Sequence, residues 1–243
     1  PIIYNDTDSS YISIKHLVEA KKIPTFTENG DVSPEYYKAV EDIEEHLNKE
    51  IITWGKSALG TRDCRLVFKR EAIADVGLFL AKKRYVLHTL DVEGIPGKKF
   101  KYTGVEVVRT TMPTPIKPYV KKIIETMLLT KDYAATNKIF NETYEIFKKL
   151  PLEDIAFVMG VKGYEKYANH CNGFETVKRM PKHVKAAYYH NILLDRFGIE
   201  RKYEKMSSGD KVRYFEVKKP NSFGLSVIGY KYYYPKEFQS IFE

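Results

Sequence analysis

The chain has 243 residues and a formal net charge of +8, a length that gives one or two domains with ample core and a charge that favours a polyanionic partner. No stretch approaches the roughly 18 consecutive apolar residues of a membrane-spanning helix, so no membrane partner is expected. The two cysteines, Cys64 and Cys171, lie far apart without metal-ligand spacing. This excludes a disulfide framework and favours free thiols in a reducing cytoplasm.

The first residues predict a β-hairpin. Apolar and polar residues roughly alternate on both sides of a short polar segment that contains Asp6 and Asp8. Aspartate suits turns because its side chain bonds the local backbone. Residues two apart on an extended chain point to the same face, so both carboxylates are expected together at the tip. Hard oxygen ligands of this kind suit Mg²⁺, although most Asp-x-Asp pairs only shape a loop.

A short helix from His16 to Lys22 and a longer helix that begins at Ser33-Pro34 are expected next. Serine is a preferred N-cap, and proline is favoured in the first helical turn. The longer helix has one apolar stripe and an opposite acidic face, which we interpret as solvated surface rather than a metal site. The stripe consists of Tyr36, Val40, Ile43, Leu47, Ile51 and Trp54.

Strands are expected at residues 65–70, at 84–88 and near Tyr102, in the same sheet as the hairpin, with breaks at Gly94, Pro96 and Gly97. From Pro113 onward the pattern is mostly helical. It predicts helices through residues 116–128, 133–150 and 183–197, and strands at 212–217 and 225–230. The sequence therefore predicts an α+β chain in which residues 1–112 form a mixed domain and residues 113–243 a helix-rich domain with a few short strands.

Three consecutive cations precede Tyr85, namely Lys82, Lys83 and Arg84. We expect them at the start of a strand. Lysines blunt open sheet edges, so charge alone leaves two interpretations open, a solvated edge and a nucleic-acid contact.

Two strings resemble motifs of one family. Tyr4 to Ser9 resembles the metal-binding palm motif of family B DNA polymerases, Tyr-Gly-Asp-Thr-Asp-Ser, with Asn5 in the glycine position. Asparagine can replace glycine where a left-handed backbone is needed. Lys82 to Tyr85 resembles the Lys-Lys-Arg-Tyr motif where palm meets thumb in the same family. Weaker likenesses follow in the right order and cover nearly the whole chain, closest to replicative polymerases of tailed phages: 69–74, 104–113, 181–191, 209–212 and 221–224.

The resemblance implies an antiparallel palm sheet with flanking helices, followed by a mostly helical thumb. It implies that Asp8 is a ligand of two catalytic Mg²⁺ ions, that Asp6 supports the site as a second catalytic residue, and that Tyr4, Thr7 and Ser9 support the nucleotide and primer end. Two metals about 3.5–4 Å apart activate the primer 3′-hydroxyl and stabilise the leaving pyrophosphate. The implied activity is DNA-directed DNA polymerisation from dNTPs.

The resemblance also implies contacts with primer–template DNA. Lys83 and Tyr85 would reach the primer end through the minor groove, where acceptors are largely shared by all base pairs. Phosphate contacts elsewhere would be sequence-independent and salt-sensitive. The implied contacts are Lys82, Arg84, Arg109, Lys182 and Lys185, with Lys162, Lys166, Lys178 and Arg179 clustered near the last two and Tyr164 and Tyr167 interleaved. An ordinary basic surface is the alternative.

In this family the fingers and the other metal-binding aspartate belong to motifs that do not occur here. We therefore expect an N-terminal polymerase half as a partner, and expect the isolated chain to be inactive. Gln239 to Phe242 faintly resembles a sliding-clamp peptide. The alternatives are a non-catalytic duplex-binding module and, less favoured, a metal nuclease that uses Asp6, Asp8 and Glu106.

Overall fold

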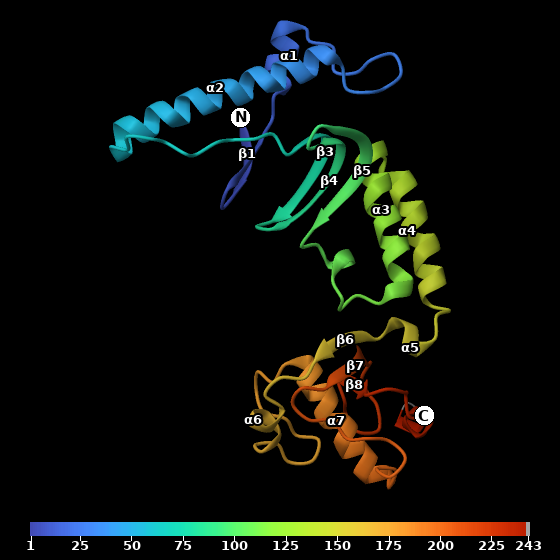
Figure 1. Ribbon diagram of the computed structural model, residues 1–243. Helices are drawn as coiled ribbons and strands as arrows, with labels where there is room; N and C mark the ends of the chain where they lie inside the picture. Colours follow the sequence, from blue (N-terminus) through green and yellow to red (C-terminus); the bar gives the residue numbers. More distant parts are fainter. Residues whose placement is uncertain (242–243) are drawn as a thin grey trace. The chain divides into compact units, whose positions relative to one another are not determined.

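The structure is a computed structural model that describes residues 1–241, and it has a mixed α+β fold (Figure 1). Within these residues the strands form three small antiparallel sheets, accompanied by helices. The chain divides into two compact units, Pro1–Val105 and Glu106–Glu243, each described separately below. The predicted α+β class is confirmed at this level. The assignment of the two parts to a palm and a thumb stays a prediction.

The first unit opens with the expected hairpin. Strand β1 (Ile2–Asp6) pairs antiparallel with β2 (Ser9–Ile12), and Thr7 and Asp8 form the turn. The left-handed residue is Thr7, with φ of 46°. Asn5 instead pairs with Ser10 in the strand. The position of Asn5 therefore does not require a left-handed backbone.

A second sheet has the order β3-β4-β5, formed by β3 (Ala72–Ala81), β4 (Arg84–Val92) and β5 (Ile95–Thr103). The β1–β2 hairpin is a separate sheet, so the prediction that it joins these strands is wrong. Gly94 lies in the turn between β4 and β5, but Pro96 and Gly97 lie inside β5. Proline is tolerated there because β5 is an edge strand.

Residues 65–70 do not form the predicted strand. Their backbone is bound by side chains of the long helix α2 (Pro34–Leu59) instead. Asn48 accepts from the N–H of Phe68 at 2.7 Å and donates to its carbonyl at 2.9 Å, and Glu44 accepts from the N–H of Arg70 at 2.7 Å. Glu44 is thus part of a docking contact rather than only of the solvated face.

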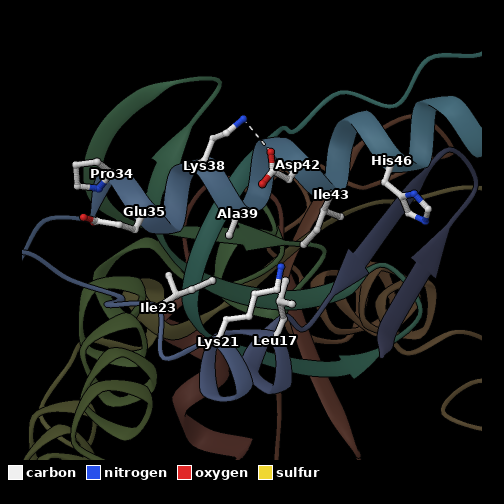
Figure 2. A pocket seen from close by; sticks show the side chains of 10 residues that line it. All are labelled: Leu17, Lys21, Ile23, Pro34, Glu35, Lys38, Ala39, Asp42, Ile43 and His46. Atoms are coloured by element: carbon white, nitrogen blue, oxygen red, sulfur yellow. Dashed lines mark ion pairs between the residues drawn. The ribbon is translucent and has the colours of Figure 1, made fainter.

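Helix α2 begins as expected, because the Ser33 hydroxyl accepts from the N–H of Tyr36 at 3.0 Å. The expected apolar stripe is not buried at the C-terminal end of the helix, where Trp54 is 49% exposed. Helix α1 (Lys15–Lys21) precedes α2 and lines a groove with it (Figure 2). The groove has a volume of about 680 Å³ and an apolar floor that includes Leu17 and Ile43.

Buried Asp91 on β4 ties the first unit together. Its carboxylate pairs with the guanidinium of Arg70 and accepts from the Tyr37 hydroxyl at 3.1 Å and the Gly94 N–H at 3.1 Å. Burial raises the pKa of Asp91, but the hydrogen bonds from Arg70, Gly94 and Tyr37 outweigh it and hold the pKa below its usual value. Charge, hydroxyl and backbone donors thus join α2, the segment before β3 and the β4–β5 turn.

The second unit has a helix pair followed by a sheet with one long helix packed on it. Helices α3 and α4 pack against each other, and α7 packs on a sheet of order β6-β7-β8 (Figure 1). Helix α4 ends three residues before the predicted limit of 150. The elements are η1 (Glu106–Val108), η2 (Thr114–Ile116), α3 (Lys117–Thr130), α4 (Tyr133–Phe147), α5 (Leu152–Ile155), β6 (Phe157–Gly160), α6 (Tyr164–Ala168), α7 (Lys182–Phe197), β7 (Lys211–Glu216), β8 (Val227–Tyr230) and η3 (Lys236–Ile241).

Helix α7 holds the core of this unit. Nine of its residues are buried, and it ends at Gly198 in the left-handed conformation, as predicted. Asn191 donates to the carbonyl of Met206 at 2.7 Å and accepts from its N–H at 2.8 Å. The two ring nitrogens of His190 lie against the carbonyls of Gly229 (3.2 Å) and Glu204 (3.1 Å). Buried polar groups on α7 therefore bind the backbone of two other segments, residues 204–206 and strand β8.

Candidate metal and nucleic-acid site

Two hairpin turns contact each other in the first unit. One is Thr7–Asp8, and the other is Lys82–Lys83 between β3 and β4. The backbone N–H of Lys83 donates to the hydroxyl of Tyr4 at 2.7 Å, and the Lys83 ammonium lies 3.7 Å from Oδ1 of Asp6. The structure thus brings together the two strings on which the family resemblance mainly rests.

The placement of the three cations differs from the prediction. Lys82 and Lys83 form a turn, and only Arg84 begins a strand. Lys83 has φ of 59°, a conformation that residues with a Cβ rarely adopt. Both lysine side chains are exposed, and a hairpin tip keeps them clear of neighbouring strands. The prediction that all three cations open a strand is therefore wrong.

Four aromatic rings hold the two hairpins together: Tyr4, Tyr11, Phe79 and Tyr85. Every pair of ring centroids lies between 5.3 and 6.0 Å apart, within the range of favourable aromatic contacts. The Tyr11 hydroxyl donates to the Tyr85 hydroxyl at 2.6 Å. Burial, and then this hydrogen bond, raise the pKa of Tyr11 well above its usual value.

Tyr85 belongs to this cluster and is only 7% exposed. Its ring packs on the β1–β2 hairpin, and its hydroxyl accepts from Tyr11. In the structure, Tyr85 therefore anchors the lysine turn. A contact between its hydroxyl and a primer end stays a prediction.

The two aspartates have different surroundings. Asp6 ends β1, its side chain is 18% exposed, and its Oδ1 accepts from the Thr7 hydroxyl at 3.1 Å. The Ser9 hydroxyl donates to the Asp6 carbonyl at 3.2 Å and closes the turn. Asp8 lies in the turn and is exposed. The sequence predicted that both aspartates lie on one face of an extended strand. In the structure only Asp6 belongs to a strand, and Asp8 belongs to the turn.

These donors fit a magnesium ion in part. Carboxylate oxygens are the ligands that Mg²⁺ prefers, and it commonly takes one or two of them together with water and phosphate. The described residues contain no group of three or more His, Cys, Asp or Glu side chains placed to hold a metal. A two-ion centre would therefore need carboxylates beyond Asp6 and Asp8.

Gly104 permits the lysine turn to sit where it does. A Cβ on Gly104 would lie 1.9 Å from the carbonyl oxygen of Lys83, and its φ of +59° is also unfavourable for other residues. The sequence did not assign a role in the site to Gly104, Tyr11 or Phe79. The signal for Gly104 is its place in the string at 104–113, whereas Phe79 lies in β3, a strand that the sequence pattern does not predict.

The other predicted DNA-binding residues belong to the second unit. Arg109 pairs with Glu106 at 3.1 Å, and Lys182, the first residue of α7, pairs with Glu216 at 2.5 Å. Lys185 is half-buried on α7. Glu106, the third carboxylate of the nuclease hypothesis, is thus held by an arginine.

The predicted interleaved tyrosines pack inward. Tyr164 and Tyr167 both contact the core of the second unit, and the Tyr164 hydroxyl accepts from Asn191 at 2.8 Å. Lys166 lies 5.8 Å from the centre of the Tyr167 ring. The neighbouring cations Lys162, Lys166, Lys178 and Arg179 are exposed.

Other features lie apart from the predicted residues. No predicted site residue lines the α1–α2 groove, whose rim carries a Lys38–Asp42 ion pair (2.8 Å; Figure 2). In the suggested clamp peptide, Gln239 to Ile241 belong to η3, Ile241 is buried, and Phe242 lies outside the described residues. Within residues 1–241 no helix has the length and hydropathy needed to cross a membrane.

No protein-family model matches the chain, and no curated protein does so either.

Proposed function

We propose that this chain supplies the catalytic hairpin and duplex contacts of a family B DNA polymerase, with residues 1–112 as the end of the palm and 113–243 as the thumb. The observation that carries the proposal is the contact between the two motif-like strings. Lys83 meets Tyr4 through its N–H and Asp6 through its ammonium, although the residues are more than 75 positions apart. A chance pair of motif-like strings has no reason to fold against each other.

In this proposal Asp8 binds magnesium and Asp6 supports it. Asp8 is exposed at the tip of a hairpin, where a substrate can reach it, while Asp6 is shielded and paired with Lys83. When bound, magnesium would activate the primer 3′-hydroxyl and stabilise the pyrophosphate of the dNTP. Thr7 and Ser9 hold the hairpin turn through their hydroxyl groups.

We assign the duplex contacts to the positively charged residues beside the hairpin. Lys82, Lys83 and Arg84 cluster at one turn, and backbone phosphates are their natural ligands. Such contacts hold any sequence, which suits an enzyme that copies its template. We assign Arg109, Lys182 and Lys185 to the same role in the second unit.

The centre is completed by another polypeptide segment. Two ions need more carboxylates than Asp6 and Asp8 provide, so we propose a complementary polymerase half that carries the remaining ligand and binds the dNTP. Nucleotide incorporation is then a property of the complex, and the isolated chain binds primer–template without extending it.

Nucleotide incorporation by the reconstituted complex tests the proposal. We expect Asp8→Asn to abolish incorporation while primer–template binding persists, and the exposed control Asp63→Asn to leave both unchanged. Robust extension by the isolated chain would refute the division of the centre. Duplex binding with incorporation unaffected by Asp8→Asn would favour the alternative, a non-catalytic duplex-binding module.

A further inference from the structure

We propose that Lys83 is an internal counter-ion of the catalytic hairpin that couples cation binding to duplex binding. In the free chain its ammonium neutralises Asp6. When a duplex phosphate binds the ammonium instead, the carboxylates of the hairpin become free to bind a divalent cation. The inference rests on the proposed function, because it takes the hairpin as the cation site and the lysine turn as the phosphate site.

The Lys83 ammonium is placed to serve either of two partners, the Asp6 carboxylate or a phosphate from solvent. The Asp6 carboxylate is shielded, and a shielded carboxylate requires a positive partner or strong hydrogen bonds. Its partners are the Lys83 ammonium at 3.7 Å and the Thr7 hydroxyl at 3.1 Å. The Lys83 side chain itself is 62% exposed, so the same ammonium is also open to solvent and to a phosphate.

The backbone of Lys83 is fixed while its side chain is not. The Tyr4 hydroxyl holds its N–H, and the close approach of Gly104 confines its carbonyl. The four-carbon stem of lysine ends in a mobile point charge with three donors. A change of partner therefore needs only a rotation of the side chain, and the turn stays in place.

The direction of the coupling follows from charge. A divalent cation on the hairpin repels the ammonium and releases it to a phosphate, and a phosphate that holds the ammonium leaves the carboxylates more negative. Each ligand thus strengthens the other, and the two effects must be equal in size. A solvent-accessible ion pair predicts a modest factor, about two- to fivefold in affinity.

Lys82 provides a matched control within the same turn. It is an exposed lysine with the same stem, and in the described part of the chain the ion pair to Asp6 is made by Lys83, not by Lys82. Lys82→Met should weaken duplex binding as a lost phosphate contact would. It should leave the coupling intact.

Titration of the full-length chain with Mn²⁺, with and without a short primer–template duplex, measures the coupling. We expect the duplex to raise the Mn²⁺ affinity of the wild-type chain about two- to fivefold. Lys83→Met should bind Mn²⁺ more tightly without duplex, by a similar factor, and gain nothing when duplex is added. Asp8→Asn lacks the proposed Mn²⁺ ligand, so the Mn²⁺ that it binds in the presence of duplex is the Mn²⁺ that the duplex itself attracts. Thermal unfolding checks that each variant is folded.

Asp6→Asn tests the same ion pair by removing the charge of the carboxylate instead of the ammonium. Because it releases Lys83, it should raise duplex affinity in the absence of Mn²⁺. If the wild-type chain binds Mn²⁺ and duplex independently, the inference falls and the proposed function stands. If the folded chain binds neither, both fall together.

Discussion

The hydroxyl of Tyr4 accepts a hydrogen bond from the backbone N–H of Lys83 at 2.7 Å, across 79 positions of sequence. A two-stranded hairpin is marginally stable by itself in water. The β1–β2 hairpin therefore depends on what it packs against, and that partner is the β3–β4 hairpin, through this bond and the four-ring cluster. The β3–β4 hairpin, itself part of a three-stranded sheet, thus helps to position the hairpin that carries the aspartates.

Tyr4→Phe should separate the hydrogen bond from the ring contacts. The ring stays in the cluster, but the Lys83 N–H loses its acceptor. We expect unfolding in urea to show a loss of about 1 kcal/mol, the usual net value of one hydrogen bond. Amide hydrogen exchange at Lys83 should become faster. Tyr133→Phe, at an exposed site on α4, is the control. Unchanged exchange at Lys83 would contradict the role given to Tyr4.

Gly104→Ala should displace the lysine turn. The new methyl group would meet the Lys83 carbonyl, and overpacking of this kind costs about 1–3 kcal/mol beyond the cost of the left-handed backbone. Gly94→Ala is a matched control, because Gly94 also has positive φ but no atom lies within 4 Å of its Cβ position. Urea unfolding should show the larger loss for Gly104→Ala, together with weaker duplex binding. Equal losses would mean that the close approach to Lys83 has no energetic weight.

Elements defined by local signals could be predicted from the sequence. The Ser33 cap and Pro34 mark the start of α2, Gly198 marks the end of α7, and the alternation around Asp6 marks the first hairpin. Residues 65–70 could not be predicted, because their backbone is bound by Asn48 and Glu44, which lie 20 and 26 positions before the residues they bind. A hydrophobic pattern does not reveal such a partner.

The candidate site was predictable in its residues but not in its geometry. The strings around Asp6 and Lys83 stand out in the sequence. A positive φ is not what a lysine favours, so the residue pattern predicts a strand where the structure has a turn. The contact of Tyr4 and Tyr11 with Phe79 is non-local. Sequence pattern alone gives no register between two hairpins that do not share a sheet.

Stability should fall in acid because of Asp91. Its folded-state pKa is lowered, so its contribution is fully present above its unfolded value, about 3.9, and is lost as the pH falls through the lower folded value. Asp91→Asn leaves Arg70 without its buried partner and should cost about 3 kcal/mol at neutral pH. Urea unfolding from pH 6 down to about pH 3 should show a flatter profile for the variant in the acid range. Parallel profiles would assign the acid sensitivity to other carboxylates.

Glu216 should restrain the contact between Lys182 and a phosphate. The Lys182 ammonium lies 2.5 Å from Glu216, so a phosphate must replace that carboxylate before it can bind there. Glu216→Gln removes the competitor, and we expect duplex affinity to rise about two- to fivefold, the range for an exposed ion pair. Glu145→Gln removes one negative charge from a similar pair between Glu145 on α4 and Lys148, the residue that follows α4, and controls for net charge. Fluorescence anisotropy at several salt concentrations measures both variants. The same gain from both would show that net charge is responsible, and no gain from Glu216→Gln would remove Lys182 from the duplex-binding surface.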